Sequence, residues 1–588
     1  MSSLRAILTA KFSRAFEKQG LDPSYGKVVD SQRPELGQFQ CNGALAAAKE
    51  ARKNPRAIAQ AVVEQLSSDP CIDSLSLAGP GFINIALSDA FLAEHISRLA
   101  EDERLGSPLP AHPHVVVVDF CGPNVAKPMH VGHLRPTIIG DALQRLMRYL
   151  GETVITDNHL GDWGTNMGIL INAMRERRPD LPYFDPEKTR SFPEEPPMTV
   201  EELEKLYPEA TAECKSDPAK MQKALDATYE LQNGRPGFVA LWKHFVNLSM
   251  TELKGDLEKL GVRFDYWLGE SFYHGKMGEL VDRLETEGKA VDSEGALVVH
   301  VAREDDKREI PPLLLRKRGG GYLYGTSDLA TLDYRVHEFG AEEIIYVVDQ
   351  RQELHFEQVF RAARRTGIAA ENVSMIHIGF GTVNGKDGRP FRTREGGAAR
   401  LSYLLAEATE KAMERMDEAG VGRDFDKAEK ADVAHKVGLA ALKFADLMNH
   451  RTSDYVFDID KFTRFEGKTG PYLLYSAVRI KSILRNAAER GVTTGPLLPP
   501  TDAERGLMLL LGKLPDVLAG AREGFAPNYM CDFIYDLAQE FNRFYRDCHI
   551  LREPDEARRG SWLSLVNIVL AELELVLGLL GMEIPERM

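Results

Sequence analysis

The feature of this 588-residue chain that most restricts its fold is a short apolar run that leads into a Gly/Pro-containing loop. The run at 115–120, VVVVDF, is mostly β-branched, as expected of a strand buried on both faces of a parallel sheet. From His133 to Leu150, apolar residues recur near the helical period, and Pro136 is tolerable in a first turn. The segment therefore predicts a strand, a loop large enough for a phosphate group, and a helix.

The same pattern returns about two hundred residues later. A buried strand is expected at 344–348, a helix at 354–365 and another strand at 373–378. These are two β-α halves of one sheet, interrupted by an insertion at about residues 170–300. The insertion holds a Pro- and Glu-rich stretch at 190–206, which we expect to be exposed and to which we assign no chemistry.

Two further domains flank the predicted sheet domain of residues 108–400. Residues 1–107 mix helical patterns with the strand-like FINIAL run and end in turn-rich sequence, which indicates a small α+β domain. Residues 401–588 keep helical periodicity apart from a break at 491–501, which predicts an α-helical bundle. The length of the chain is consistent with several domains.

Composition excludes several classes of protein. A net charge of −15 argues against a surface that coats nucleic acid as a whole, although a local basic patch remains compatible with it. The six cysteines form no C-x-x-C pair, which fits neither a disulfide framework nor a thiolate zinc site and favours a reduced, cytoplasmic setting. The apolar segment at 561–581 carries Glu572 and Glu574 in its middle, so we expect a buried bundle helix and no membrane span.

His130, Gly132 and His133 lie where the predicted loop meets the helix. Backbone N–H groups and the helix dipole favour an anion at such a junction. Gly132 leaves room for a nucleotide, and either histidine can donate to a phosphate oxygen. A metal site is the main alternative, but no third ligand follows at a recognisable spacing. The motif alone favours nucleotide chemistry over a simple turn.

The extended segment GPNVAKPMHVGHLR resembles the first signature of class I aminoacyl-tRNA synthetases, in the form associated with the arginyl enzymes. The resemblance implies a Rossmann-like catalytic domain in which His130, Gly132 and His133 act on ATP. It assigns to Lys127 the cation that a second signature would otherwise supply. It also implies that Asp119 and Asn124 hold the amino acid, although the acidic position is often glutamate in the family.

Two later segments extend the resemblance in the family's order. The run at 157–166 is similar to a family stretch that usually ends in Gln, where this chain has Asn166; its Trp163 has an equally good interpretation as a core residue. Tyr324 and Asp328 lie four residues apart on a probable helix, and a carboxylate can accept the forked donors of a guanidinium. Asp328 is the leading arginine-selecting residue, with a helix-capping carboxylate as the alternative.

Gln352 and His355 match the family's Asp-x-x-Gln-x-x-His run at the end of a strand, where parallel sheets bind ligands. The resemblance places Gln352 among the arginine-binding residues. The basic loop at 385–397 departs from the usual second signature, Lys-Met-Ser-Lys-Ser. Its Lys386, Arg392 and Arg394 are candidate phosphate ligands, and a merely solvated loop is the alternative.

The tRNA contacts are expected at both ends of the chain. The segment from 469 to 485 combines aromatic and basic residues on one helical stretch and resembles the start of the family's anticodon-binding module. Core tyrosines with extended cations are an equally good interpretation for any single residue. The N-terminal domain resembles the family's additional tRNA-binding domain. The predicted tRNA-binding residues are Tyr472, Tyr475, Arg479, Lys481, Gln38, Phe39 and Asn42.

The resemblance covers nearly the whole chain and implies ATP-dependent ligation of L-arginine to tRNA(Arg), with Mg²⁺ accompanying ATP and no structural metal. It further implies a cytoplasmic protein, expected to be a monomer, whose arginine activation requires bound tRNA. Another H-x-G-H nucleotidyl transferase, such as a cysteine ligase, is disfavoured because no Cys/His cluster is present to select a thiol. A catalytically silent tRNA-binding paralogue is opposed by the intact Lys127 and histidine motif.

Overall fold

The structure is a computed structural model that describes residues 2–318, 321–389, 391 and 400–588. The chain divides into two compact units. One consists of 111–411 with 449–461, and the other of 1–110 with 412–448 and 462–588. Each is described separately below.

A four-stranded parallel sheet forms the centre of the first unit. Its strand order is β11-β10-β5-β6, with β5 at Val115–Phe120, β6 at Thr153–Asp157, β10 at Glu343–Val347 and β11 at Ser374–Ile378. All three strand pairs are parallel, so the carboxyl ends of the strands meet at one edge. The apolar run that predicted β5 is almost entirely buried, which confirms the expected parallel-sheet domain.

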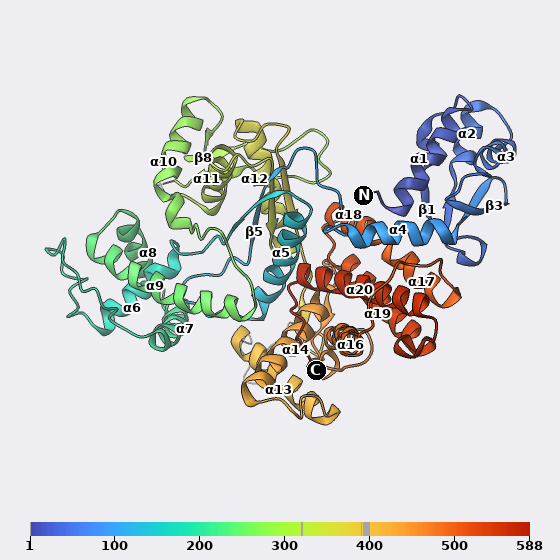
Figure 1. The fold of residues 1–588 in the computed structure, drawn as a ribbon. Helices are drawn as coiled ribbons and strands as arrows, with labels where there is room; N and C mark the ends of the chain where they lie inside the picture. Colours follow the sequence, from blue (N-terminus) through green and yellow to red (C-terminus); the bar gives the residue numbers. More distant parts are fainter. Residues whose placement is uncertain (1, 319–320, 390, 392–399) are drawn as a thin grey trace. The chain divides into compact units, whose positions relative to one another are not determined.

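Three helices of this unit carry residues of the candidate site at the carboxyl edge of the sheet. They are α5 at Val131–Tyr149, α11 at Tyr324–His337 and α12 at Glu353–Thr366. Figure 1 shows α5 beside β5, and a Cβ on Gly140 would lie 2.2 Å from the Phe120 ring, so this glycine permits their close approach. Helix α5 begins at Val131, which places Pro136 beyond the first turn where we expected it.

The insertion between β6 and β10 is mostly helical. Its elements are α6 Thr165–Arg177, α7 Val200–Ser216, α8 Pro218–Gln232, α9 Pro236–Lys259, α10 Glu270–Thr286, β7 Val291–Ser293, β8 Ala296–Val299 and β9 Leu313–Arg316. Helices α6 to α9 bury a core of their own, with Leu170, Leu203 and Phe245 among its members. The Pro- and Glu-rich stretch leads into α7, which starts with Thr199 and Glu202 in a reciprocal capping box.

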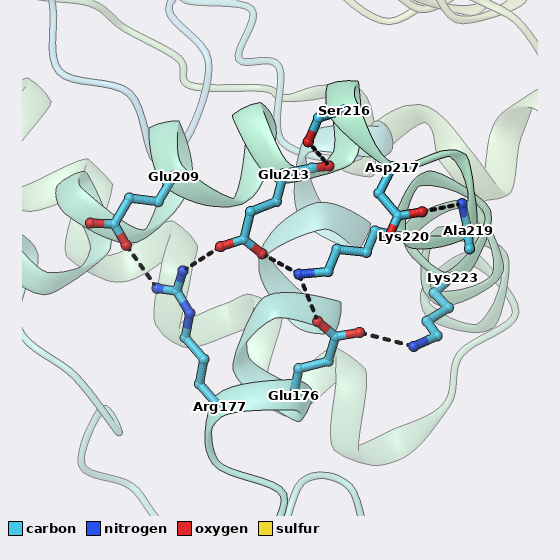
Figure 2. A network of polar contacts seen from close by, with 9 residues as sticks. All are labelled: Glu176, Arg177, Glu209, Glu213, Ser216, Asp217, Ala219, Lys220 and Lys223. Carbon is cyan, nitrogen blue, oxygen red and sulfur yellow. Dashed lines mark hydrogen bonds and ion pairs between the residues drawn. The ribbon is translucent and has the colours of Figure 1, made fainter.

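A network of ion pairs also joins three insertion helices (Figure 2). Arg177 of α6 lies 3.1 Å from Glu209 and 3.2 Å from Glu213 of α7. Lys220 of α8 lies 2.6 Å from Glu213 and 3.7 Å from Glu176. Exposed pairs of this kind each contribute little because solvent screens them, so the apolar core is what holds the insertion together.

The second unit contains a small α+β domain and a helical bundle. The small domain has a sheet in the order β1-β2-β4-β3, and its elements are α1 Leu4–Glu17, β1 Val28–Asp30, β2 Phe39–Cys41, α2 Gly43–Ala51, α3 Pro55–Leu66, β3 Ile72–Ala78, β4 Phe82–Leu87 and α4 Asp89–Glu101. The bundle comprises α14 Lys427–Leu447, α16 Gly470–Glu489, α17 Asp502–Leu511, α18 Leu514–Glu523, α19 Asn528–Asp547 and α20 Glu556–Leu579. Arg505 of α17 pairs with Asp89 of α4. The small domain and the bundle therefore pack on each other within this unit.

Helix α20 is the one helix, among the described residues, long and apolar enough to cross a membrane. The most apolar 18-residue stretch of this helix is 67% buried inside the protein. Glu572, near its middle, is fully buried. The prediction of a buried bundle helix is confirmed.

The sequence analysis missed β6 of the central sheet, the three-stranded sheet β7-β8-β9 and a short parallel strand pair. A two-residue strand, β13 at Tyr455–Val456, pairs in parallel with β12 at Val383–Asn384. Helices α13 at Leu401–Ala419 and α14 lie between these two strands along the chain, and α15 at Ile459–Phe462 follows β13. Because a two-residue strand has no periodicity of its own, it depends on a partner about seventy residues away in sequence.

Candidate active site

The loop between β5 and α5 holds both histidines at the N-terminus of a helix. His130 is the N-cap residue, and its Nδ1 accepts a hydrogen bond of 3.0 Å from the backbone N–H of Gly132. The Nδ1 atom of His133 accepts one of 3.2 Å from the backbone N–H of His130. Cys121 and Ala126 of the same loop have φ values of +77° and +64°, an uncommon backbone for residues other than glycine that often marks a functional site.

These two hydrogen bonds determine where the histidine protons reside. A backbone N–H can only donate, so each Nδ1 must be unprotonated and each neutral ring must carry its proton on Nε2. Burial, reinforced by Lys127, lowers the pKa of His130. Burial, with His130 and Lys127 adding to it, lowers the pKa of His133 to about 3. Both rings are therefore neutral Nε2–H donors at physiological pH.

Gly132 is required between the two rings, whose centroids are 4.0 Å apart. A Cβ at this position would lie 2.8 Å from Cε1 and 3.0 Å from Nδ1 of His130. Any side chain would displace the imidazole from its bond to the helix N-terminus. The expected proximity of His130, Gly132 and His133 is thus present in the structure.

Lys127 lies three residues before His130 and contacts the insertion. Its Nζ is 5.2 Å from the centroid of the Tyr207 ring, which belongs to α7. This distance is within the range of a cation–π interaction. The insertion, to which the sequence assigned no chemistry, therefore supplies a neighbour to the candidate phosphate cation.

A cavity of about 250 Å³ opens at the carboxyl ends of β5 and β10. Gly132 and His133 line one part of it, and Asp119 and Asp328 line another. Residues that are more than two hundred positions apart in sequence thus share one pocket at the edge where parallel sheets bind ligands. Its lining also includes Phe120, Cys121, Gly122, Pro136, His159, Tyr346, Val347, Val348, Asp349, Phe356 and Phe380.

Asp119 already has an internal partner. Its Oδ2 accepts a hydrogen bond of 2.7 Å from Arg335, a fully buried residue of α11, and the same guanidinium nitrogen lies 2.8 Å from Asp157. Burial opposes the charge of Arg335, but Asp119, Tyr346 and Asp157 outweigh it and raise the Arg335 pKa well above its usual value. Asp119 neutralises a buried cation of the protein itself through Oδ2. Only its other carboxylate oxygen, Oδ1, is left for the expected direct contact with substrate arginine.

Asp328 lies one turn into α11 and has a partner on α12. His355 Nε2 is 2.5 Å from its Oδ2, and this hydrogen bond raises the His355 pKa in spite of burial. The alternative interpretation, a capping carboxylate, receives no support, because no side-chain cap bond is present at the start of α11. Tyr324, the first residue of that helix, is 67% exposed.

Glu270 is a carboxylate that the sequence analysis missed. Burial raises its pKa to about 7, and His159, Asp162 and Asp328 are among the groups that act on its charge. Its Oε2 would lie 3.9 Å, and the Tyr324 hydroxyl 3.7 Å, from a Cβ placed on Gly164. Glu270 and Tyr324 thus converge beside the 157–166 segment, and no motif on α10 could have revealed this.

The remaining predicted arginine and phosphate ligands are less closely grouped. The Asn124 Oδ1 lies against Gly161, at 2.1 Å from where a Cβ would be, which fixes the loop to the 157–166 segment. Gln352 is exposed at the start of α12 and does not line the cavity. Lys386 is 69% exposed and its Nζ lies 3.3 Å from Asp458. Arg392 and Arg394 lie outside the described residues.

Trp163 and Asn166 have structural contacts. The Trp163 ring packs edge-on against Trp242 at a centroid distance of 4.8 Å, which supports the core interpretation. The Asn166 side chain donates a 3.2 Å hydrogen bond to the Gly161 carbonyl oxygen. The 157–166 segment therefore packs against the insertion through Trp163 and is braced internally by Asn166.

In the bundle, α16 lines a cavity of about 640 Å³. Arg479 lies 4.9 Å from the Tyr475 ring centroid and 5.7 Å from that of Tyr545 on α19. Tyr472 accepts a 2.9 Å hydrogen bond from Asn542, and Lys481 is paired with Glu574 at 3.4 Å and Glu586 at 3.1 Å. Tyr475 and Arg479 face the cavity, whereas Tyr472 and Lys481 are engaged within the protein. The cavity is also lined by Val478, Ser482, Ile483, Asn486, Arg490, Arg546, His549, Ile550, Leu551, Arg552 and Met588.

One expectation for the N-terminal domain is wrong. Phe39 is 2% exposed and belongs to the core of the small sheet, so its ring cannot contact RNA unless the domain opens. Gln38 uses its side-chain oxygen to accept a 3.0 Å hydrogen bond from the Leu87 backbone N–H. Asn42 is exposed just before α2, and its side chain makes no cap hydrogen bond. Phe39 lies in a three-residue strand between β1 and β4, and the register with these two partners decides which of its residues is buried.

The parallel sheet, the donor pair at the start of α5 and the ligand cavity at the strand ends define a nucleotide-binding enzyme domain of the class I synthetase type. A family model for the catalytic domain of "tRNA synthetases class I (R)" matches residues 95–459. Models for the "DALR anticodon binding domain" and the "Arginyl tRNA synthetase N terminal domain" match 473–588 and 2–87. The chain belongs to the arginyl-tRNA synthetase family.

Relatives match over the full length. The arginine–tRNA ligases of Maricaulis maris and Hyphomonas neptunium are 50% and 49% identical to this chain, with each chain covered completely. Solved arginyl-tRNA synthetases from Plasmodium falciparum and Thermus thermophilus match with TM-scores of 0.82 and 0.80 at 26% and 25% identity, again over 100% of each chain.

Proposed function

We propose that this protein ligates L-arginine to tRNA(Arg) in two ATP-dependent steps. The observation that carries the proposal is the shared cavity in which His133, a neutral donor at a helix N-terminus, lies with Asp328, a carboxylate suited to a guanidinium. Family membership and full-length relatives named arginine–tRNA ligase support the same activity.

In the first step, an oxygen of the arginine carboxylate attacks the α-phosphorus of ATP. The new O–P bond forms as the bond to the bridging oxygen breaks, and pyrophosphate leaves with that electron pair. His130 and His133 donate Nε2–H to the phosphate oxygens on which negative charge increases, and Lys127 acts on the departing pyrophosphate. The protein forms no covalent intermediate, so alignment and charge stabilisation carry the catalysis.

In the second step, a terminal ribose hydroxyl of the tRNA attacks the carbonyl carbon of arginyl-adenylate. The ester bond forms, the acyl–phosphate bond breaks, and AMP leaves. Mg²⁺ accompanies ATP as part of the substrate, because the phosphate oxygens supply ligands to it. Among the described residues no group of three His, Cys, Asp or Glu side chains is arranged to hold a metal ion.

Arginine recognition falls to the carboxylates at the cavity. Asp328 accepts the guanidinium, with the Tyr324 hydroxyl and Asn124 completing the pocket and Glu270 adding a second carboxylate nearby. The Asp119 contribution is indirect, since it orients Arg335 and the end of β5. Gln352 remains a proposed arginine ligand, and Lys386, Arg392 and Arg394 remain proposed phosphate ligands.

The second unit contacts the anticodon region of the tRNA. The Tyr475–Arg479–Tyr545 stack lines a 640 Å³ cavity with π faces and cationic groups, which suits unpaired bases and their phosphates. Tyr472 and Lys481 support this wall. We retain the boundaries 1–107, 108–400 and 401–588 for the N-terminal, catalytic and anticodon-binding domains, with Gln38 and Asn42 as N-terminal contacts. The protein acts as a cytoplasmic monomer.

The decisive experiment is aminoacylation of total tRNA with each of the twenty amino acids. We expect charging with arginine alone, and arginine-dependent ATP–pyrophosphate exchange only when tRNA is present. Charging with a different amino acid would overturn the substrate. Robust exchange without tRNA would overturn the tRNA requirement and leave the substrate assignment intact.

A further inference from the structure

A second cavity lies at the β11 edge of the sheet and has a volume of about 930 Å³. Six of its lining residues are Arg or Lys, and three are Asp or Glu. In a protein with a net charge of −15, such a local excess of cations is the reverse of the general composition. The charged lining residues are Arg303, Lys307, Arg308, Arg361, Arg364, Arg451, Asp306, Glu353 and Glu357.

The acidic side chains do not neutralise the whole cavity. Asp306 pairs with Arg361 at 2.7 Å, and Glu357 pairs with Arg361 at 2.7 Å and with Arg308 at 3.1 Å. Arg364 donates to the backbone carbonyl oxygens of Ala370 and Val373. Within the described part of the chain, three further cations at this cavity have no carboxylate partner. They are Arg303, Lys307 and Arg451.

Arg451 is the most informative of the three. Its Nε atom is buried and has no hydrogen-bond partner among the described residues, and burial lowers the pKa of its guanidinium. A buried donor without a partner costs free energy, and more so when the group is charged. Its backbone is held in place, because the Arg451 carbonyl oxygen accepts a 2.9 Å hydrogen bond from the Gly381 N–H. An anion in the cavity would supply the missing acceptor.

The basic cavity adjoins the candidate active site along two chain segments. Gln350 and Gly379 line it, whereas the preceding Asp349 and the following Phe380 line the smaller cavity that holds His133. The two cavities therefore lie next to each other at the carboxyl ends of β10 and β11.

We propose that this basic cavity, with Arg451, Arg303 and Lys307 as its free cations, binds backbone phosphates of the tRNA while its terminal ribose occupies the neighbouring active site. This inference rests on the function proposed above. The reaction brings two polyanions to this edge of the sheet, ATP and tRNA. The ATP phosphates are provided for by the α5 N-terminus and Lys127, in the smaller cavity and its loop. A broad opening lined by separated cations suits the spaced phosphodiesters of tRNA better than it suits the triphosphate of ATP.

The test uses the full-length protein and unmodified tRNA. Two variants remove charge, Arg451→Gln and the double substitution Arg303→Gln/Lys307→Gln, and Arg451→Lys retains it. Arg365→Gln is the matched control, since Arg365 is exposed on α12, the helix that contributes Arg361 and Arg364, but does not line the cavity. The measurements are the Kd for tRNA across a series of salt concentrations, and the KM values for tRNA, ATP and arginine.

We expect each charge-removing variant to weaken tRNA binding by roughly tenfold, and the control by less than about twofold. The slope of log Kd against log salt should become shallower by roughly 0.7–0.9 for each phosphate contact that is lost. Arg451→Lys should restore much of the binding, and the KM for ATP should not change. The double variant alters only exposed side chains, so it keeps the test valid if Arg451→Gln does not fold.

Two results would overturn the proposal. An increased KM for ATP with an unchanged tRNA Kd would assign the cavity to the nucleotide. Unchanged tRNA binding and an unchanged salt slope in both charge-removing variants would show that the cavity holds no phosphate. Because tRNA binding is measured directly, either result is distinguishable from a failure to charge arginine.

Discussion

His355 Nε2 lies 2.5 Å from the Asp328 Oδ2, so the carboxylate that we assign to the substrate guanidinium is paired with an imidazole in the free protein. The hydrogen bond raises the pKa of His355, burial opposes the increase, and the Asp328 charge adds to it. A substrate guanidinium therefore competes with an imidazolium for one carboxylate.

This competition makes arginine binding depend on pH. Because the folded pKa of His355 lies above its unfolded value of about 6.5, the imidazolium–carboxylate pair is complete below pH ~6.5. The pair and its stabilisation are lost as the pH rises through the raised pKa. We expect the KM for arginine to fall as the pH increases from about 6 to 8, and His355→Gln to flatten this dependence. Identical profiles for the parent protein and the variant would contradict it.

Asp328→Asn tests the carboxylate itself. The amide keeps the shape but removes the charge that pairs with the guanidinium, a loss of about 3 kcal/mol or roughly 100-fold in the KM for arginine. Inhibition by citrulline, the uncharged analogue, should change far less in this variant. An equal loss for arginine and citrulline would instead indicate a disrupted pocket.

His133 should act without changing its charge. With a pKa of about 3, it is neutral from pH 5 to 9 and donates from Nε2 throughout. We expect His133→Ala to reduce kcat for arginylation by roughly 10²–10³-fold, as for the loss of one oxyanion donor, and His133→Asn to retain part of the rate. An ionisation near pH 6.5 in the kcat profile that disappears in His133→Asn would contradict neutral-donor catalysis.

Asp119→Asn should act on stability. The substitution removes one of the two carboxylates around the fully buried Arg335, and breaking a buried pair costs about 3–5 kcal/mol. We expect a decrease of this size in the free energy of unfolding, measured in urea. Asp333 lies on α11, the helix of Arg335, and forms a surface pair with Arg283 of α10. Asp333→Asn should cost under about 1 kcal/mol. Equal effects in the two variants would mean that Arg335 does not depend on Asp119.

Tyr207→Leu tests whether the insertion positions Lys127. Loss of the ring removes the cation–π contact at 5.2 Å, worth roughly 0.5–2 kcal/mol, and frees the ammonium. We expect the KM for ATP to increase about 2- to 30-fold, corresponding to that range. Tyr207→Phe keeps the ring and should behave like the parent protein. A similar increase in Tyr207→Phe would attribute the effect to the hydroxyl group instead.

The sequence by itself determined the features that depend on near neighbours along the chain. The run at 115–120 predicted a buried parallel strand, and the His130–His133 spacing predicted a helix N-terminus, because strand burial and helix capping are set within a few residues. The ordered motifs also identified the family.

Only the tertiary structure decided what each charged side chain contacts. Asp119 meets Arg335 across 216 residues, Lys127 meets Tyr207 of the insertion, and Arg451 reaches a cavity formed by three distant segments. Phe39 was expected at a surface and lies in a core, since burial depends on the partner strand. The physical reason is common to all of these. Ion pairing and burial depend on distances between groups far apart in sequence, and no local periodicity encodes those distances.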